Sequence, residues 1–164
     1  MSYLIVGNFF SLLSVLALGW AASRKNKKDF MFWNIWDTVF GTLANFVLSA
    51  YAALIICILG LIRNYLSYRG TLTQNITYVL LVLSIIIGAY INNLGIIGWL
   101  PIIAAGGYTL GIYWTRNEQQ LRWVLLINFV LWFIHNVYIQ AYPALIGNIA
   151  LSFWTAFQIY KNRR

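Results

Sequence analysis

Residues 30–62 read FMFWNIWDTVFGTLANFVLSAYAALIICILGLI, an apolar run that contains one charged residue, Asp37. As a single helix this run would be about 50 Å long at 1.5 Å per residue, whereas the hydrocarbon core of a bilayer is roughly 30 Å thick. The run is too long for one crossing and long enough for two. We therefore predict one helix over 30–48, a tight turn around residues 49–51, and a second helix over 51–67.

The distribution of charge supports two crossings. Every Lys and Arg falls in one of four clusters, at 24–28, 63–69, 116–122 and 161–164. Two crossings put the first two clusters on the same side of the membrane, whereas one crossing would separate Lys28 from Arg63. Since basic residues mark the cytoplasmic side of a membrane protein, we expect the N-terminus outside and the C-terminus in the cytoplasm.

The rest of the chain has the same apolar character: of 164 residues, 62% are hydrophobic and 9% are charged. Because this composition is far more apolar than that of a soluble domain, we predict an all-α membrane protein with seven transmembrane helices. The net charge of +8 comes mainly from the flanks of these helices, so it indicates membrane orientation rather than nucleic-acid binding. The predicted helices lie near 3–22, 30–48, 51–67, 74–91, 97–114, 120–139 and 142–160.

The chain resembles itself at an offset of 91 residues. AYAALIICI at 50–58 pairs without a gap with AYPALIGNI at 141–149, and six of the nine positions are identical. The same offset pairs Asn45 with Asn136. Chance similarity between apolar helices is the alternative to a true duplication.

A duplication predicts a three-one-three architecture within a single transmembrane domain, 1–164. Residues 3–67 form a first three-helix repeat, 74–91 a connector helix, and 97–160 a second three-helix repeat. Because the connector is a single helix, the second repeat enters the membrane from the same side as the first. The repeats are then parallel and related by an axis along the membrane normal.

The three-one-three plan with an outside N-terminus resembles the SWEET and PQ-loop (MtN3-like) superfamily, which includes vitamin transporters and the KDEL receptor. The chain more closely resembles the bacterial inner-membrane YgjV family (Imp-YgjV). The segments that carry this resemblance are LIRNYLSYR at 61–69, WLPIIAAGGYTLGIYW at 99–114 and WFIHNVY at 132–138. The resemblance covers nearly the whole chain and implies a SWEET-like, multi-pass protein of the bacterial inner (cytoplasmic) membrane.

Polar side chains within the predicted helices indicate an internal cavity, because polar groups are costly in hydrocarbon and turn toward the bundle interior. Amides, an indole face and an imidazole together suit a neutral polar ligand such as a sugar, a nucleoside or a vitamin. Hydrogen bonding between helices is the alternative use of the asparagines. The candidate substrate-binding residues are Asn45, Trp132, His135, Asn136, Asn148 and Ser152.

Asp37 and Arg63 are the charged residues that lie well inside the predicted helices. We favour a structural ion pair between neighbouring helices over cation coupling through Asp37. Cys57 is the only cysteine and His135 the only histidine, so we expect neither a metal site nor a cofactor. The sequence also shows no phosphate-binding loop and no nucleophile beside a base, so an enzyme is not expected.

These observations favour a small-molecule transporter, a facilitator of a neutral polar metabolite that uses a cavity between the two repeats. A membrane binding or assembly protein with the same fold and no transport is the second hypothesis. A membrane enzyme is the third. The expected partners are the lipid bilayer and a small neutral polar ligand; a homo-oligomer is compatible with the sequence, and nucleic acid is not expected.

Overall fold

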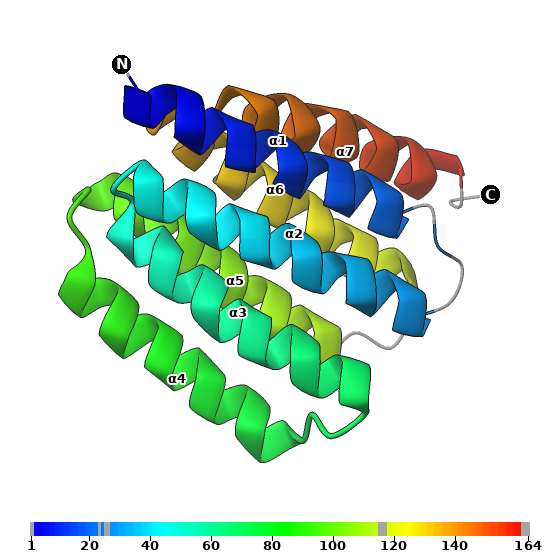
Figure 1. Ribbon diagram of the computed structural model, residues 1–164. Coiled ribbons are helices and arrows are strands. Elements are labelled where there is room, and N and C mark those ends of the chain that lie inside the picture. The colour runs from blue at the N-terminus through cyan, green and yellow to red at the C-terminus, as the bar shows by residue number, and fades with distance from the viewer. Residues whose placement is uncertain (1, 23, 25–26, 115–117, 162–164) are drawn as a thin grey trace.

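The computed structural model describes residues 2–22, 24, 27–114 and 118–161. In these ranges the chain forms seven α-helices and no strand (Figure 1), so the all-helical prediction is confirmed. Each helix begins and ends within three residues of its predicted bounds. The helices are α1 Ser2–Ala22, α2 Lys27–Val47, α3 Tyr51–Arg69, α4 Gln74–Ile91, α5 Ile96–Trp114, α6 Glu118–Tyr138 and α7 Tyr142–Lys161.

The bundle has two different ends, because successive helices run in opposite directions (Figure 1). The connections α2–α3, α4–α5 and α6–α7 lie at one end, which we call the turn end. The start of α1 is also at this end, and the end of α7 is at the other. The opposite end, which we call the basic end, carries Arg24, Lys28, Arg69 and Lys161.

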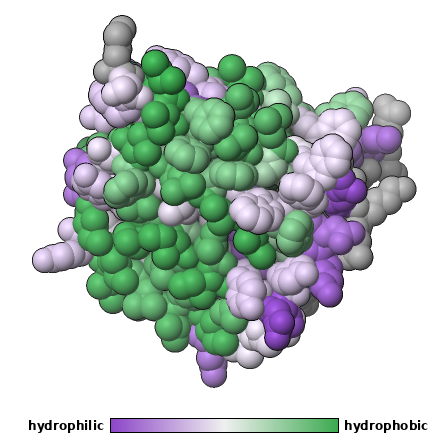
Figure 2. Space-filling view, viewed as in Figure 1, coloured by the Kyte–Doolittle hydropathy of each residue, from purple (hydrophilic) through white to green (hydrophobic). Residues whose placement is uncertain are grey.

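The surface of the bundle is strongly apolar. Figure 2 shows hydrophobic residues over most of one face, with hydrophilic residues gathered toward the basic end. The side chains of Ile5, Ile86 and Phe153 are 72%, 61% and 73% exposed, and large exposed apolar areas of this kind mark contact with a membrane or with another protein. By length and composition α1, α3 and α4 can cross a membrane, whereas α5 and α6 contain shorter apolar helices, Ile96–Gly111 and Arg122–Tyr138.

Local signals set the helix ends. After α3, Gly70 has a φ of 71°, the left-handed conformation that glycine adopts without strain. Thr73 then caps α4, because its side chain accepts a hydrogen bond of 3.4 Å from the N–H of Ile76. At the turn end, Pro143 lies in the first turn of α7, where a missing N–H removes no helical hydrogen bond.

The α2–α3 and α6–α7 turns have the same geometry. Ser49 and Gln140, which are 91 residues apart, have φ angles of 57° and 60°. In each turn the N–H of the following alanine donates to the carbonyl of an asparagine five residues earlier. The distance is 2.9 Å from Ala50 to Asn45 and 3.0 Å from Ala141 to Asn136. The predicted break in the 30–62 run therefore lies at Ser49, and an equivalent break lies at Gln140.

Helix packing shows the same correspondence. α1 contacts α2 and α7, α2 contacts α3, α3 contacts α4 and α5, and α6 contacts α5 and α7. Exchanging α1 with α5, α2 with α6 and α3 with α7 maps these contacts onto one another, apart from those of α4. We call α1–α3 the first group and α5–α7 the second. The two groups meet along two seams, α1–α7 and α3–α5, and α4 packs against α3 and α5.

Small residues allow close packing at the seams, as is common between membrane helices. At the α1–α7 seam, a Cβ atom added to Gly147 would lie 2.8 Å from a methyl carbon of Val15. Any larger residue there would therefore require the Val15 side chain or its helix to shift. At the α3–α5 seam, Ala52, Ile56 and Ile102 are buried together.

Candidate functional site

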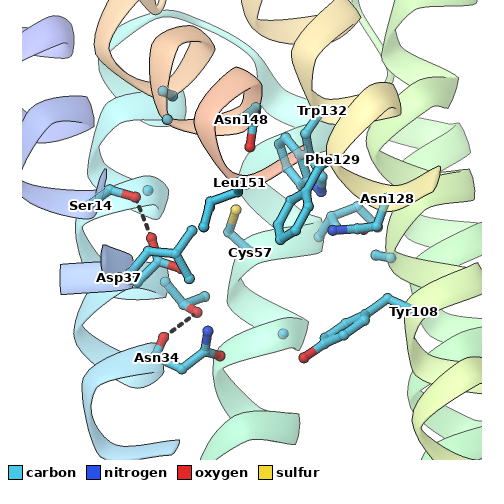
Figure 3. Close-up of a pocket in the computed structure, with 18 of the residues that line it drawn as sticks. Ser14, Asn34, Asp37, Cys57, Tyr108, Asn128, Phe129, Trp132, Asn148 and Leu151 are labelled. Carbon is cyan, nitrogen blue, oxygen red and sulfur yellow. Dashed lines mark hydrogen bonds between the residues drawn. The ribbon is translucent and has the colours of Figure 1, made fainter. Parts of the chain in front are cut away.

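A cavity of about 790 Å³ lies among the helices of both groups (Figure 3). Its volume falls within the range of small-molecule binding sites. All seven helices contribute to its wall, α4 through Leu80 and Ser84. The wall is mainly apolar by area, and the polar residues set into it include Ser14, Asn34, Asn45, Asn128, Asn148 and Thr155.

Four of the six predicted substrate-binding residues line this cavity: Asn45, Trp132, Asn136 and Asn148. Asn45 and Asn136 lie at equivalent positions, just before the two matching turns. Figure 3 shows Asn148 of α7 and Trp132 of α6 on the same side of the cavity. The cavity therefore brings together predicted residues from α2 of the first group and from α6 and α7 of the second.

The other two predicted residues, His135 and Ser152, do not line the cavity. His135 is fully buried, and its ring meets Trp132 edge-on with a centroid distance of 5.5 Å. Within the part of the chain that the structure describes, neither nitrogen of its ring has a hydrogen-bond partner. Consecutive helical residues point about 100° apart. Because Asn136 faces the cavity, the preceding residue His135 points to one side of it. For the same reason Ser152 is turned away beside Leu151.

Asp37 lies on the cavity wall near the middle of α2. The Ser14 hydroxyl of α1 donates a hydrogen bond of 2.5 Å to its carboxyl group (Figure 3). Among the described residues, Ser14 is the only one that is hydrogen-bonded to this side chain. A neutral group from the neighbouring helix therefore holds the carboxyl group in place.

Arg63 lies on the wall from α3 and points toward α5. Its Nη1 donates a hydrogen bond of 2.8 Å to the hydroxyl of Thr109, and its guanidinium lies over the ring of Tyr108, 4.8 Å from the centroid. Its Nε and Nη2 donate to Oδ1 of Asn64 at 3.2 and 3.1 Å. The guanidinium is thus fixed by neutral groups and by an aromatic face.

The expected ion pair between Asp37 and Arg63 is absent among the residues that the structure describes. The two side chains leave neighbouring helices in different directions, toward α1 for Asp37 and toward α5 for Arg63. Two opposite charges therefore line one cavity without pairing. A third charge, Arg122, lines the cavity closer to the basic end, where its Nη1 donates to the carbonyl of Gln158 at 3.5 Å.

Two of the asparagines donate hydrogen bonds that tie helices together, as the alternative interpretation expects. Nδ2 of Asn64 donates to Oδ1 of Asn34 at 2.6 Å and to the hydroxyl of Thr38 at 3.0 Å, which joins α3 to α2. Nδ2 of Asn45 lies 3.5 Å from the sulfur of Cys57, also across the α2–α3 contact. These amides hold the first group together as well as lining the cavity.

Asn128 and Asn148 differ from these two. They line the cavity from α6 and α7, and neither side chain has a hydrogen bond to another residue in the described part of the chain. Figure 3 shows them on the wall that also carries Trp132. Since an amide has two donors and an acceptor, this wall offers hydrogen bonds beside a flat apolar face.

Most of the cavity wall repeats at the 91-residue offset. Equivalent positions that both line the cavity include Asn45 and Asn136, Cys57 and Asn148, and Asn64 and Thr155. The charges break this correspondence, because the equivalent of Asp37 is Asn128 and that of Arg63 is Trp154. The first group thus presents a carboxyl group and a guanidinium where the second presents an amide and an indole.

The two ends of the cavity differ. At the turn end, a buried apolar cluster lies beside it, formed by Ala50, Ala53, Ile139 and Ala141. Toward the basic end, the lining residues Arg122 and Gln158 are partly exposed. The cavity therefore has partly exposed polar residues toward the basic end and buried apolar residues beside it at the turn end.

The lining residues that were not predicted include the neighbours of the two charged side chains, Ser14, Tyr108 and Thr109. Ser14 and Thr109 carry hydroxyl groups in very apolar helices, so the rule that polar groups face the interior would have selected them. Tyr108 carries no such signal, because aromatic residues are common throughout the chain. Its role depends on the position of Arg63, which is known only from the fold.

Comparison with known proteins agrees with the membrane character of the surface. The sequence model of the Imp-YgjV family, described as bacterial inner membrane protein, matches residues 5–164. The similarity extends over all seven helices. No curated protein and no solved structure matches the chain.

Proposed function

Because the chain belongs to the Imp-YgjV family of bacterial inner membrane proteins, we propose that it transports a small polar metabolite of zero net charge across that membrane. The observation that carries this proposal is the cavity of about 790 Å³ between the two helix groups, whose wall includes amide, hydroxyl and charged side chains. In transporters built from repeats, the substrate site lies at the interface between the repeats. The cavity lies between the two helix groups, which we propose below to be repeats.

In this proposal all seven helices cross the membrane, with the N-terminus outside and the C-terminus in the cytoplasm. The support is the position of the basic residues, because those in the described helices lie toward one end of the bundle. The positive-inside rule assigns this end to the cytoplasm. The less apolar helices α2, α6 and α7 then cross as parts of the bundle, since their polar residues face the cavity.

We also propose that the two groups are parallel repeats joined by α4, in the three-one-three plan of SWEET-like proteins. The matching turns at Ser49 and Gln140, and the corresponding helix contacts, support a duplication. The repeats should superpose with Asn45 over Asn136, by rotation about the membrane normal.

Transport requires the cavity to open to each side in turn. Its lining residues Arg122 and Gln158 are partly exposed toward the basic end, and the buried cluster of Ala50, Ala53, Ile139 and Ala141 lies beside it at the turn end. Opening to the outside would separate the α2–α3 turn from the α6–α7 turn. Small sliding movements along the two seams would allow this, as in shear motions of packed helices.

Solute counterflow into proteoliposomes tests the proposal. The purified protein would be given a panel of sugars, nucleosides, vitamins and amino acids, and exchange would be followed by mass spectrometry. We expect at least one solute to exchange faster than in protein-free liposomes, and Asn148→Ala to slow that exchange. The matched control is Asn75→Ala, since Asn75 is exposed at the start of α4. A solute that binds without exchanging would favour a binding protein with this fold. If no solute in the panel either binds or exchanges, the proposal is contradicted.

A further inference from the structure

We propose that the ligand of this cavity is a soluble zwitterion, such as a free amino acid, whose carboxylate binds Arg63 and whose ammonium group binds Asp37. This inference rests on the proposed function, since it names the class of molecule that the cavity takes. It is carried by two opposite charges that line the same cavity and are held by different neighbours.

Charged side chains within a membrane are costly and mark substrate or ion sites when they face a cavity. The guanidinium of Arg63 has five N–H groups, and three of its hydrogen bonds go to Thr109 and Asn64. The carboxyl group of Asp37 accepts one hydrogen bond, from Ser14. Hydrogen bonds between opposite charges are stronger than those to neutral groups. Both side chains therefore retain capacity for a charged partner.

The two charges lie at a similar depth. Asp37 is about 15 Å from the turn end along α2, and Arg63 is about 18 Å from it along α3, at 1.5 Å per residue. Their side chains have different partners, on α1 for Asp37 and on α5 for Arg63, and both residues line the cavity. In this proposal one small molecule with charges at two positions contacts both.

The net charge of the ligand follows from this arrangement. A cation would leave Arg63 without a counterion, an anion would leave Asp37 without one, and an uncharged sugar would match neither. A zwitterion matches both and carries no net charge. Arg122 lies about one helical turn from the basic end of α6, where it donates to the carbonyl of Gln158, so it lies closer to the entrance than to this pair.

The second group indicates where the rest of the ligand lies. The equivalents of the two charged residues are neutral, Asn128 and Trp154. With the charged head held by the first group, the amino-acid side chain would face Asn128, Asn148 and Trp132. This wall combines amides with an aromatic face, which suits a polar or aromatic side chain.

Binding measurements with capped ligands test the inference on the unaltered protein. Thermal unfolding in detergent would be recorded with each common L-amino acid, and the amino acid that stabilises most would be compared with its N-acetyl form and its amide. We expect either cap to weaken binding by about tenfold to a hundredfold, since a hydrogen bond to a charged group contributes about 1.5–3 kcal/mol. Equal binding of the free and the capped forms would overturn the inference.

Two variants then assign each end of the ligand. Arg63→Gln should bind the free acid and its amide equally, and Asp37→Asn should bind the free amine and its N-acetyl form equally. Asn75→Ala, at an exposed position, should keep the full preference for the zwitterion. If either variant fails to fold, the comparison of capped ligands still decides the question. Unchanged preferences in both folded variants would assign the binding elsewhere and overturn the inference.

The counterflow panel separates this inference from the proposed function. Exchange of sugars or nucleosides, with no binding of amino acids, would overturn the zwitterion and leave transport standing. Amino-acid binding without counterflow would support the zwitterionic ligand and contradict the proposed transport. Stabilisation by phosphatidylethanolamine but by no soluble amino acid would identify a lipid headgroup as the zwitterion and overturn a soluble ligand.

Discussion

Asn8 and Asn93 make the same pair of hydrogen bonds, each to one of the two matching turns. The amide of Asn8 donates to the carbonyl of Gln140 at 3.0 Å and accepts from the N–H two residues later at 2.8 Å. The amide of Asn93 donates to the carbonyl of Ser49 at 2.7 Å and accepts from the N–H two residues later at 3.2 Å. Asn8 belongs to α1 and Asn93 to the α4–α5 connection. Two asparagines at positions that are not equivalent in the two groups therefore satisfy the equivalent backbone groups of the two turns.

Removal of either asparagine should loosen its turn. Asn93→Ala loses two hydrogen bonds, each worth about 0.5–1.5 kcal/mol, so we expect a loss of about 1–3 kcal/mol in the free energy of unfolding. Asn8→Ala should lose at least as much, because its amide also donates to the carbonyl of Leu4 at 2.9 Å. Unfolding in detergent measures both losses. Asn75→Ala is the control, and losses no larger than that of the control would show that these bonds do not stabilise the turns.

Reporter fusions test the orientation of the helices. Fusions after residues 27, 70, 118 and 164 should report the cytoplasm, and fusions at 50, 94 and 141 should report the outside. The reason is the one-sided position of Lys and Arg. A cytoplasmic signal at 50 would exclude two crossings between residues 30 and 62, and with them the seven-helix topology.

The asparagines on the cavity wall should respond differently to truncation. Asn148→Ala should reduce ligand binding with little loss of stability, because the amide has no hydrogen bond to a described residue. Asn136→Ala, at the equivalent of Asn45, should also reduce binding. Asn45→Ala should lower stability by about 0.6 kcal/mol and by at most about 1.7, the range of interhelical hydrogen bonds in membranes. Stability and ligand uptake would be measured on the same samples. Full uptake by Asn136→Ala and Asn148→Ala, with a clear loss of stability, would show that this wall serves packing.

A methyl group at the α1–α7 seam should be destabilising. Gly147→Ala places a Cβ atom 2.8 Å from Val15, and overpacking of this kind costs about 1–3 kcal/mol. Gly107→Ala is the matched control, because a Cβ atom there meets nothing within 4 Å. Adding Val15→Ala to Gly147→Ala should restore part of the lost stability. Equal effects of the two glycine substitutions would mean that the seam can widen freely.

The helices could be predicted from sequence because several independent signals coincide at their ends. Lys and Arg mark the basic end, and the length of the 30–62 run requires a break that the structure has at Ser49. Gly70 and Thr73 are standard signals for the end of one helix and the start of the next. The parallel repeat stays a prediction, supported by the two turns.

The site was less predictable, because periodicity shows which residues share a helix face and not what that face meets. His135 and Asn136 are adjacent, yet only Asn136 lines the cavity. Asp37 and Arg63 are on neighbouring helices, which suggested a pair. Their actual neighbours depend on the positions of α1 and α5, and the sequence of α2 and α3 contains no information about these positions.

The polar contacts of α2 have a consequence for how the protein is made. Asp37 is hydrogen-bonded to Ser14 of α1, and Asn34 accepts from Asn64 of α3. α2 is also not among the helices apolar enough to cross a membrane by composition. A nascent α2 that left the insertion machinery alone would expose these groups to lipid. We therefore expect α2 to wait beside α1 until α3 has been synthesised, so that the first three helices enter the bilayer together.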